Sequence, residues 1–227
     1  MADQTSALPF AVPAGLEPFA DPVAVLVSKK YTFFPRPITH FIASALVFNP
    51  EGRLLTVQRS ATDFGANLWE IPGGCVDPHE SVLQGAAREL FEEAGLKMVS
   101  VQCAVGPRAV PPAGAVVPAG EAERLSELDI SGAKYDARAG QTFDDGNPAK
   151  DWVWCRVAFI VGVEDCGKVV LDPVEHQAYM WLTEEEVREA RRGEKEIEFA
   201  SEEMRAIMLE AFRVKRTAEV GSGDVEA

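Results

Sequence analysis

Three glutamates lie close together in one stretch of the sequence and could do chemistry as a group. Glu89, Glu92 and Glu93 are spaced i, i+3 and i+4, so a helix would carry them on one face. Like charges at these spacings repel by roughly a few tenths of a kcal/mol, and the dipole near a helix C-terminus disfavours anions. A bound cation would offset this cost, and clustered carboxylate oxygens suit Mg²⁺ or Mn²⁺. The pattern therefore predicts a divalent-metal site.

A glycine pair, Gly73 and Gly74, precedes the glutamates. Backbone without side chains lets a carbonyl group approach a metal, or lets a phosphate group approach the chain. The chain has a formal charge of −14, which argues against general binding to nucleic acid or anionic membranes. A phosphate compound would need a local cation. These features favour pyrophosphate chemistry, in which bound metal neutralises the substrate and activates a water for in-line attack at phosphorus.

The element that carries the glutamates is expected to be a helix from about Ser81 to Ala94, ended by Gly95. Residues on one stripe of that helix should face the core, and these are Leu83, Ala86, Ala87, Leu90 and Ala94. A capping box at Thr183 predicts another helix to about Arg192. A final helix is expected over 201–215, with an apolar face of Met204, Ile207, Met208, Ala211 and Phe212.

Strands are expected where β-branched and aromatic runs stand between turn signals. The predicted strands span residues 40–48, 53–58, 68–71, 97–105, 152–163 and 178–182. The first two should form a hairpin around the turn at 49–52, and residues 72–74 should break the third.

The 227 residues, 47% of them hydrophobic and 26% charged, are enough for a globular protein with a substantial core. We expect an N-terminal arm over residues 1–37, one domain over 38–216 and a flexible tail over 217–227. A Pro/Gly/Ala-rich insertion at about 106–150 interrupts the domain. Scattered cysteines and the lack of a signal or membrane-spanning run predict a cytoplasmic protein, with a nuclear location left open.

Residues 74–96 match the Nudix box, G-x5-E-x7-R-E-U-x-E-E-x-G-U with U aliphatic, at every defined position. Residues 69–74, W-E-I-P-G-G, also resemble the approach to that box in the family. The resemblance implies an α/β (α+β) fold, an α/β/α sandwich around a mixed β-sheet. It further implies a hydrolase that cleaves a nucleoside diphosphate linked to another moiety, with Mg²⁺ or Mn²⁺ as cofactor.

The resemblance also implies roles for single residues. The metal ligands would be Glu89, Glu92 and Glu93, with the carbonyl of Gly73 as a further ligand. Glu80 would support the turn before the helix and reach metal through water. Arg88 would hold the carboxylate cluster by a charge-assisted hydrogen bond.

Several assignments stay open at the level of sequence. Arg59 is either a phosphate contact or a surface charge, and Trp69 and Gly74 are further expected substrate contacts. The general base is Glu89 or Glu175, and Asp144 and Asp145 in the insertion are weaker candidates for a lid carboxylate. His176 either orients the substrate or is a solvated loop residue.

Two other functional classes compete with a hydrolase. A non-catalytic Nudix module would sense a nucleotide or bind a protein, but such modules usually lose box carboxylates, which this chain keeps. A prenyl diphosphate isomerase of the same fold would need a catalytic cysteine and a divergent box, for which Cys75 does not suffice. The expected partner is a small nucleoside diphosphate derivative, and a homodimer is possible by analogy with relatives.

Overall fold

The computed structural model describes residues 8–28, 38–105, 150 and 152–222. Only the backbone is described for 128–130, 133–135, 140–144 and 219–222.

A mixed sheet forms the centre of the molecule, with strand order β4-β1-β9-β5 and β8 also paired to β9. Strand β1 (His40–Val47) runs parallel to β9 (Val153–Val163). Strands β4 (Gly73–Cys75), β5 (Met98–Val105) and β8 (Gly140–Asp144) run antiparallel to their neighbours. The predicted mixed sheet is therefore confirmed.

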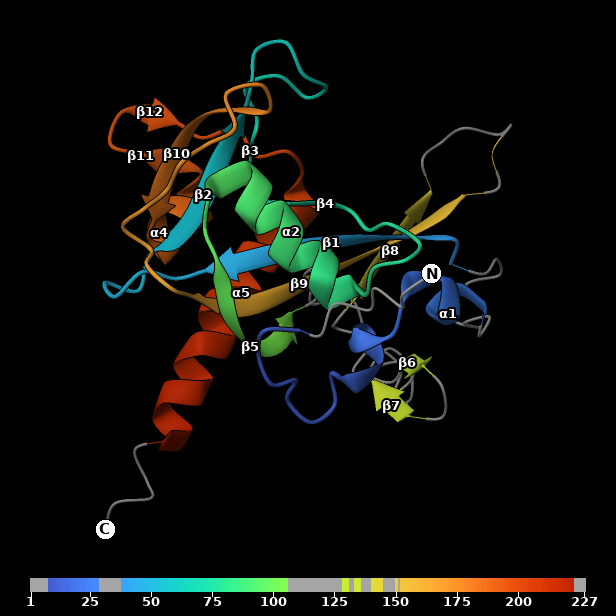
Figure 1. Cartoon of the computed structure of the whole chain (residues 1–227). Coiled ribbons are helices and arrows are strands. Elements are labelled where there is room, and N and C mark those ends of the chain that lie inside the picture. Colours follow the sequence, from blue (N-terminus) through green and yellow to red (C-terminus); the bar gives the residue numbers. More distant parts are fainter. Residues whose placement is uncertain are drawn as a thin grey trace, which may run out of the picture.

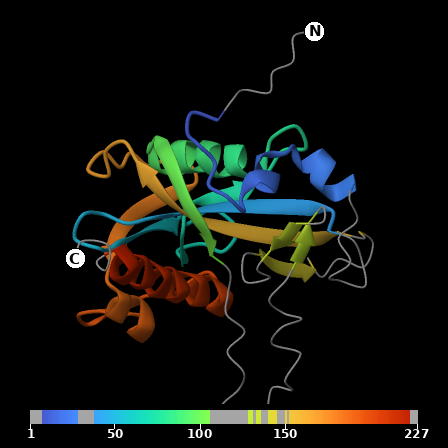
Figure 2. The ribbon, with the colours of Figure 1, turned by 90° about the horizontal axis from the view of Figure 1, so that it is seen from below.

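Helices cover both faces of this sheet, as Figure 2 shows. On one face lies α2 (Val82–Ala94), together with η1 (Glu17–Ala20) and α1 (Val23–Ser28) from the N-terminal region. On the other face lies α5 (Glu202–Ser222). The three layers are those of the predicted α/β/α sandwich.

Alternation along the strands divides the core between the two faces. Phe41 and Ala43 of β1 pack on the α2 side, whereas Leu46 packs on the α5 side. The predicted apolar face of α5 is confirmed, since its five residues are all buried in the second cluster. No helix in the described part of the chain is both long and apolar enough to cross a bilayer.

A second sheet of order β10-β2-β3 lies beside the first (Figure 1). It consists of β10 (His176–Leu182), β2 (Leu54–Arg59) and β3 (Trp69–Glu70). The predicted hairpin of residues 40–48 with 53–58 is wrong beyond a single bridge from Phe48 to Leu54. The strands diverge after the turn because each has a longer partner elsewhere: β1 pairs eight residues with β9, and β2 pairs six with β10.

Two other predicted boundaries are wrong. The predicted strand is broken, since β3 ends at Glu70, but the break does not extend to residue 74, because Gly73 and Gly74 already belong to strand β4, where glycine can approach β1 closely at Ser44. Helix α4 (Glu184–Glu189) ends before the predicted Arg192, since Ala190 adopts a left-handed conformation with φ 50°. A small hairpin of β11 (Arg191–Arg192) and β12 (Lys195–Glu196) follows.

Helix α5 continues seven residues past its predicted end at Lys215. Arg216 pairs with Glu184 of α4, and the Thr217 hydroxyl donates to the Arg213 carbonyl at 3.0 Å. These contacts extend the helix into the segment predicted to be a flexible tail.

The predicted insertion contains short strands. Besides β8, β6 (Leu128–Ile130) pairs with β7 (Ala133–Tyr135). The remainder of residues 106–149 lies outside the described part of the chain.

Candidate active site

The ends of α2 are fixed by local interactions that orient its faces. Ser81 caps the N-terminus, where its hydroxyl accepts from the Gln84 N–H and the Gln84 side chain accepts from the Ser81 N–H. Gly95 ends the helix in a left-handed conformation with φ 67°. The predicted apolar stripe is confirmed: Leu83, Ala86, Leu90 and Ala94 are fully buried and Ala87 is partly buried.

Glu93 is the most deeply buried carboxylate of the helix, with 5% of its surface exposed. Its Oε2 accepts a hydrogen bond from the Gly73 N–H at 2.8 Å. Burial raises the pKa of Glu93 to about 9, with further contributions from the negative charges of Glu70, Glu89 and Glu175. A buried carboxyl group in such surroundings has a high affinity for a cation, whether a proton or a metal ion.

Glu89 lies one turn earlier and is also largely buried, with 12% of its side chain exposed. Burial raises the pKa of Glu89 above its ordinary value. A Cβ at position 74 would stand 2.6 Å from Glu89 Oε2. Gly74 therefore makes room for this carboxylate, which is a structural reason for a glycine where a substrate contact was predicted.

Arg88 binds the carboxylates of the helix and of the preceding turn. Its Nε and Nη2 donate to the two oxygens of Glu80 at 2.8 and 3.0 Å. Its Nη1 donates to Glu89 and Glu92, each at 2.8 Å, and Nη2 also reaches the Cys75 carbonyl at 2.9 Å. These are charge-assisted bonds of the kind the family resemblance implies for Arg88. Arg88 thus holds Glu80 in place, which is consistent with the expected role of Glu80 in supporting the turn before the helix.

The three glutamates of the helix do not share one environment, although they share a face. The Glu92 side chain is 54% exposed, whereas those of Glu89 and Glu93 lie against the sheet. The rotation of roughly 100° between adjacent helical residues turns Glu92 toward solvent and Glu93 toward the Gly73 backbone. Two ligands at a site here would come from buried positions and one from the rim.

Arg59 is not a free surface charge, because its guanidinium is held by neighbours. Nη1 donates to Oε1 of the buried Glu70 at 2.6 Å, Nε donates to the Phe64 carbonyl at 2.5 Å, and Nη2 pairs with Asp63. The predicted phosphate contact of Arg59 stays a prediction. Trp69 is only 9% exposed and packs in the core beneath α5, which argues against its predicted contact with substrate.

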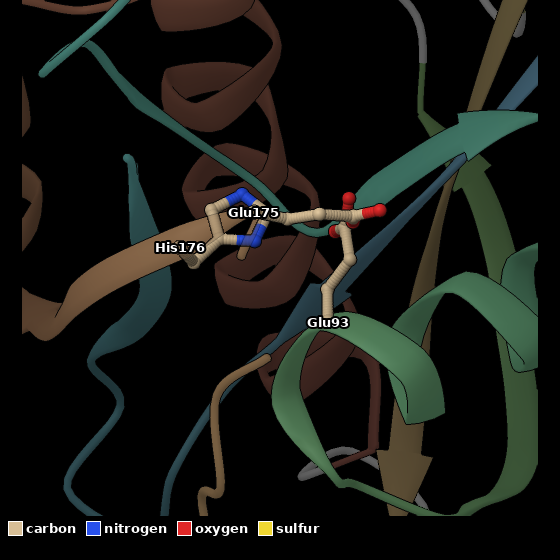
Figure 3. Close-up of side chains that lie close together, drawn as sticks. All are labelled: Glu93, Glu175 and His176. Atoms are coloured by element: carbon tan, nitrogen blue, oxygen red, sulfur yellow. The ribbon is translucent and has the colours of Figure 1, made fainter. Parts of the chain in front are cut away.

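His176 corrects the expectation of a solvated loop histidine. It is the first residue of β10, lies opposite Arg59 of β2 and is only 2% exposed. One of its ring nitrogens and one carboxylate oxygen each of Glu93 and Glu175 all lie within 4.8 Å of one another (Figure 3). The structure therefore brings the predicted Glu175 to Glu93, from elements far apart in the sequence.

Sequence reasoning missed Glu70 and the burial of His176. Glu70 accepts from Arg59 and lies 3.4 Å from His176 Nε2, so it links β2, β3 and β10. Side chains of a strand alternate between its two faces, so residue 176 shares a face with residue 178. Extending the predicted strand 178–182 back by two residues would therefore have placed His176 inward. Asp145 lies outside the described residues, and only the backbone of Asp144, in β8, is described.

The connection between β9 and β10 also closes the C-terminal end of α2. The Val170 N–H donates to the Ala94 carbonyl at 2.9 Å, and the Asp172 N–H donates to the Glu93 carbonyl at 3.4 Å. The backbone that leads to Glu175 is thereby tied to the helix that carries Glu93.

The raised pKa of Glu93 predicts how the metal-free protein responds to pH. The folded pKa of about 9 lies above the ordinary value of 4.5, so the folded state binds a proton that the unfolded state has lost. The free energy of unfolding should fall as pH rises through this window, by at most about 1.4 kcal/mol per pH unit. Urea unfolding in a chelator at a series of pH values measures this slope.

Glu93→Gln is the control for that slope, because it removes the titrating group. The variant should show a shallower slope in the same window. Equal slopes for the wild-type protein and the variant would contradict the assignment to Glu93.

Comparison with known proteins identifies the same family that the motif at residues 74–96 resembles. Residues 39–201 match the family model described as NUDIX domain. A CTP pyrophosphohydrolase from Escherichia coli (strain K12) is 43% identical over 53 residues, which are 23% of this chain and 39% of that protein. An RNA pyrophosphohydrolase from Rhizobium meliloti (strain 1021) is 42% identical over 50 residues, 22% of this chain and 30% of that protein.

The chain thus matches less than two fifths of the length of either curated relative. The crystal structure of a MutT protein from Methanosarcina mazei Go1 is similar with a TM-score of 0.49 at 23% sequence identity, over 78% of this chain and 94% of that chain. The family model itself covers well over half of the residues, and the protein therefore belongs to the NUDIX domain family.

Proposed function

We propose that the protein is a metal-dependent hydrolase that cleaves the diphosphate linkage of a nucleoside diphosphate derivative by water attack at phosphorus. The observation that carries the proposal is the buried carboxylate of Glu93. It is anchored by the Gly73 N–H and placed near Glu89 and Glu175, a set of oxygens that needs a cation when ionised. The pyrophosphohydrolases among the relatives support the same reaction class.

The residues present fit Mg²⁺ or Mn²⁺, because hard carboxylate oxygens gather where burial disfavours uncompensated charge. We assign Glu89, Glu92 and Glu93 as the ligands, with the Gly73 carbonyl as a further one and Glu80 acting through water. When bound, the ion supplies charge neutralisation of the diphosphate and lowers the pKa of a water.

The chain's own residues would position the reacting groups. Arg88 fixes the orientation of Glu89 and Glu92 through Nη1. Glu89 is a candidate general base because its raised pKa makes it a stronger proton acceptor. Glu175 is the other candidate, since its carboxylate lies beside Glu93 while its side chain remains exposed to solvent.

The choice of substrate is open within this class. The curated relatives are named for CTP and for RNA, and each match covers only a part of those proteins. We propose a small nucleoside diphosphate derivative, with the insertion at 106–150 as a determinant of specificity and Arg59 as a phosphate contact.

A substrate screen tests the proposal. Purified protein with Mg²⁺ or Mn²⁺ should convert at least one member of a panel into two phosphate-bearing products, identified by mass spectrometry. The panel contains nucleotide sugars, dinucleoside polyphosphates, canonical and oxidised nucleoside triphosphates, NADH, CoA and a 5′-triphosphate RNA. An intact panel would refute the hydrolase, and thermal shifts without products would support the non-catalytic module instead.

A further inference from the structure

The imidazole of His176 has a buried nitrogen that no described residue satisfies with a hydrogen bond. His176 is 2% exposed, and its Nδ1 has no hydrogen-bond partner within the described ranges of the chain. Leaving a buried polar atom without a partner lowers the stability of the folded state. One ring nitrogen of His176 also lies near carboxylate oxygens of Glu93 and Glu175, and a buried imidazole with an unpartnered nitrogen next to two carboxylates indicates a ligand in that place.

The spacing of the neighbouring groups suits a single ion. The His176 nitrogen and the oxygens of Glu93 and Glu175 lie within 4.8 Å of one another. Zinc-type bonds of about 2.0–2.2 Å place two ligands of one ion at most about 4.3 Å apart. Side-chain rotations that shorten these distances by about half an ångström would complete the geometry, and the exposed Glu175 is the freest of the three to rotate.

Glu70 gives the imidazole the orientation that a metal ligand requires. Its Oε1 lies 3.4 Å from His176 Nε2 and is itself held by Arg59 Nη1 at 2.6 Å. A proton on Nε2 that points toward Glu70 leaves the lone pair on Nδ1. Carboxylates commonly hold metal-binding histidines in this way, fixing the tautomer and raising the basicity of the ligand.

We propose that His176, Glu175 and Glu93 form a metal position with one nitrogen and two oxygen ligands. A position with an imidazole ligand favours Mn²⁺ and later transition metals over Mg²⁺, which prefers oxygen. It differs from the box ligands by taking two of its three groups from β10 and the residue before it. The proposal rests on the proposed function only in that both place an ion at Glu93.

Pulsed electron paramagnetic resonance of bound Mn²⁺ tests this position directly. The chain contains three histidines, His40, His79 and His176, and the untagged protein is used. The spectrum should show the ¹⁴N modulation of a coordinated imidazole. The double variant His40→Gln/His79→Gln should keep that modulation, because it leaves His176 as the only imidazole.

His176→Gln should abolish the modulation, with the exposed His79→Gln as its matched single-site control. Isothermal titration should show Mn²⁺ affinity at least about tenfold weaker in His176→Gln. Should that variant fail to fold, Glu175→Gln removes a ligand at the surface and should weaken Mn²⁺ binding similarly. No ¹⁴N modulation in wild-type protein, or its loss in the double variant, would overturn the proposal.

These results are separable from the outcome of the substrate screen. Hydrolysis with no ¹⁴N modulation would leave the proposed function standing and overturn the nitrogen ligand. Modulation from His176 in a protein that hydrolyses nothing on the panel would support the metal position and refute the hydrolase.

Discussion

Glu93→Gln is expected to lower kcat by about a thousandfold or more, equivalent to about 4 kcal/mol of transition-state stabilisation. The carboxylate is buried and the negative charges of Glu70, Glu89 and Glu175 act on it, so the substitution should remove the proposed ionic ligand at the centre of the site. The glutamine oxygen can still accept from the Gly73 N–H, which preserves the local backbone. Steady-state kinetics on the substrate found by the screen measures the change.

The matched control is Glu189→Gln, an exposed glutamate at the end of α4 that loses the same charge. It should retain wild-type kinetics. Circular dichroism and urea unfolding at neutral pH should show a folded Glu93→Gln protein. Wild-type turnover in that variant would refute Glu93 as a metal ligand.

Gly73→Ala is expected to lower the free energy of unfolding by about 4 kcal/mol, or to prevent folding. A Cβ there would stand 2.3 Å from the Ala43 carbonyl oxygen and 2.6 Å from Ser44 Cα, both of them backbone atoms of the neighbouring strand. Gly73 also has φ 155°, a backbone conformation that residues with a side chain rarely adopt. Urea unfolding measures the loss.

Gly52→Ala separates the two causes. Gly52 has φ 73°, but a Cβ there meets nothing within 4 Å, so only the backbone strain of about 1–2 kcal/mol applies. The loss at position 73 should clearly exceed the loss at position 52. Equal losses would show that the close approach of β4 to β1 contributes nothing.

The parts of the fold that the sequence predicts well are those with strong local signals. The helix of the box ends within one residue of expectation because Ser81 caps it and Gly95 terminates it. The pairing of strands is predicted less well, since a turn at Asn49 is local whereas the longest pairings of β1 and β2 are with β9 and β10, more than a hundred residues later. The local sequence pattern of a strand does not identify the distant strand with which it pairs.

The candidate site is likewise predicted only where the signal is local. The glutamates of α2 follow from spacing, and the partners of Arg88 follow from the resemblance. The burial of Trp69 and His176 depends on β3 and β10 packing beside α5 and α2, which no neighbouring residue specifies. The approach of Glu175 to Glu93 was therefore open to prediction only by analogy.

The tie between the end of α2 and the segment before β10 has a consequence for the order of folding. The helix can form early from its own caps, but the Asp172 N–H reaches the Glu93 carbonyl only after a long loop has closed. Glu175 follows three residues later on the same backbone. Partly folded chains with a complete helix would thus lack the full carboxylate set, so the proposed metal position would form only once the native topology is in place.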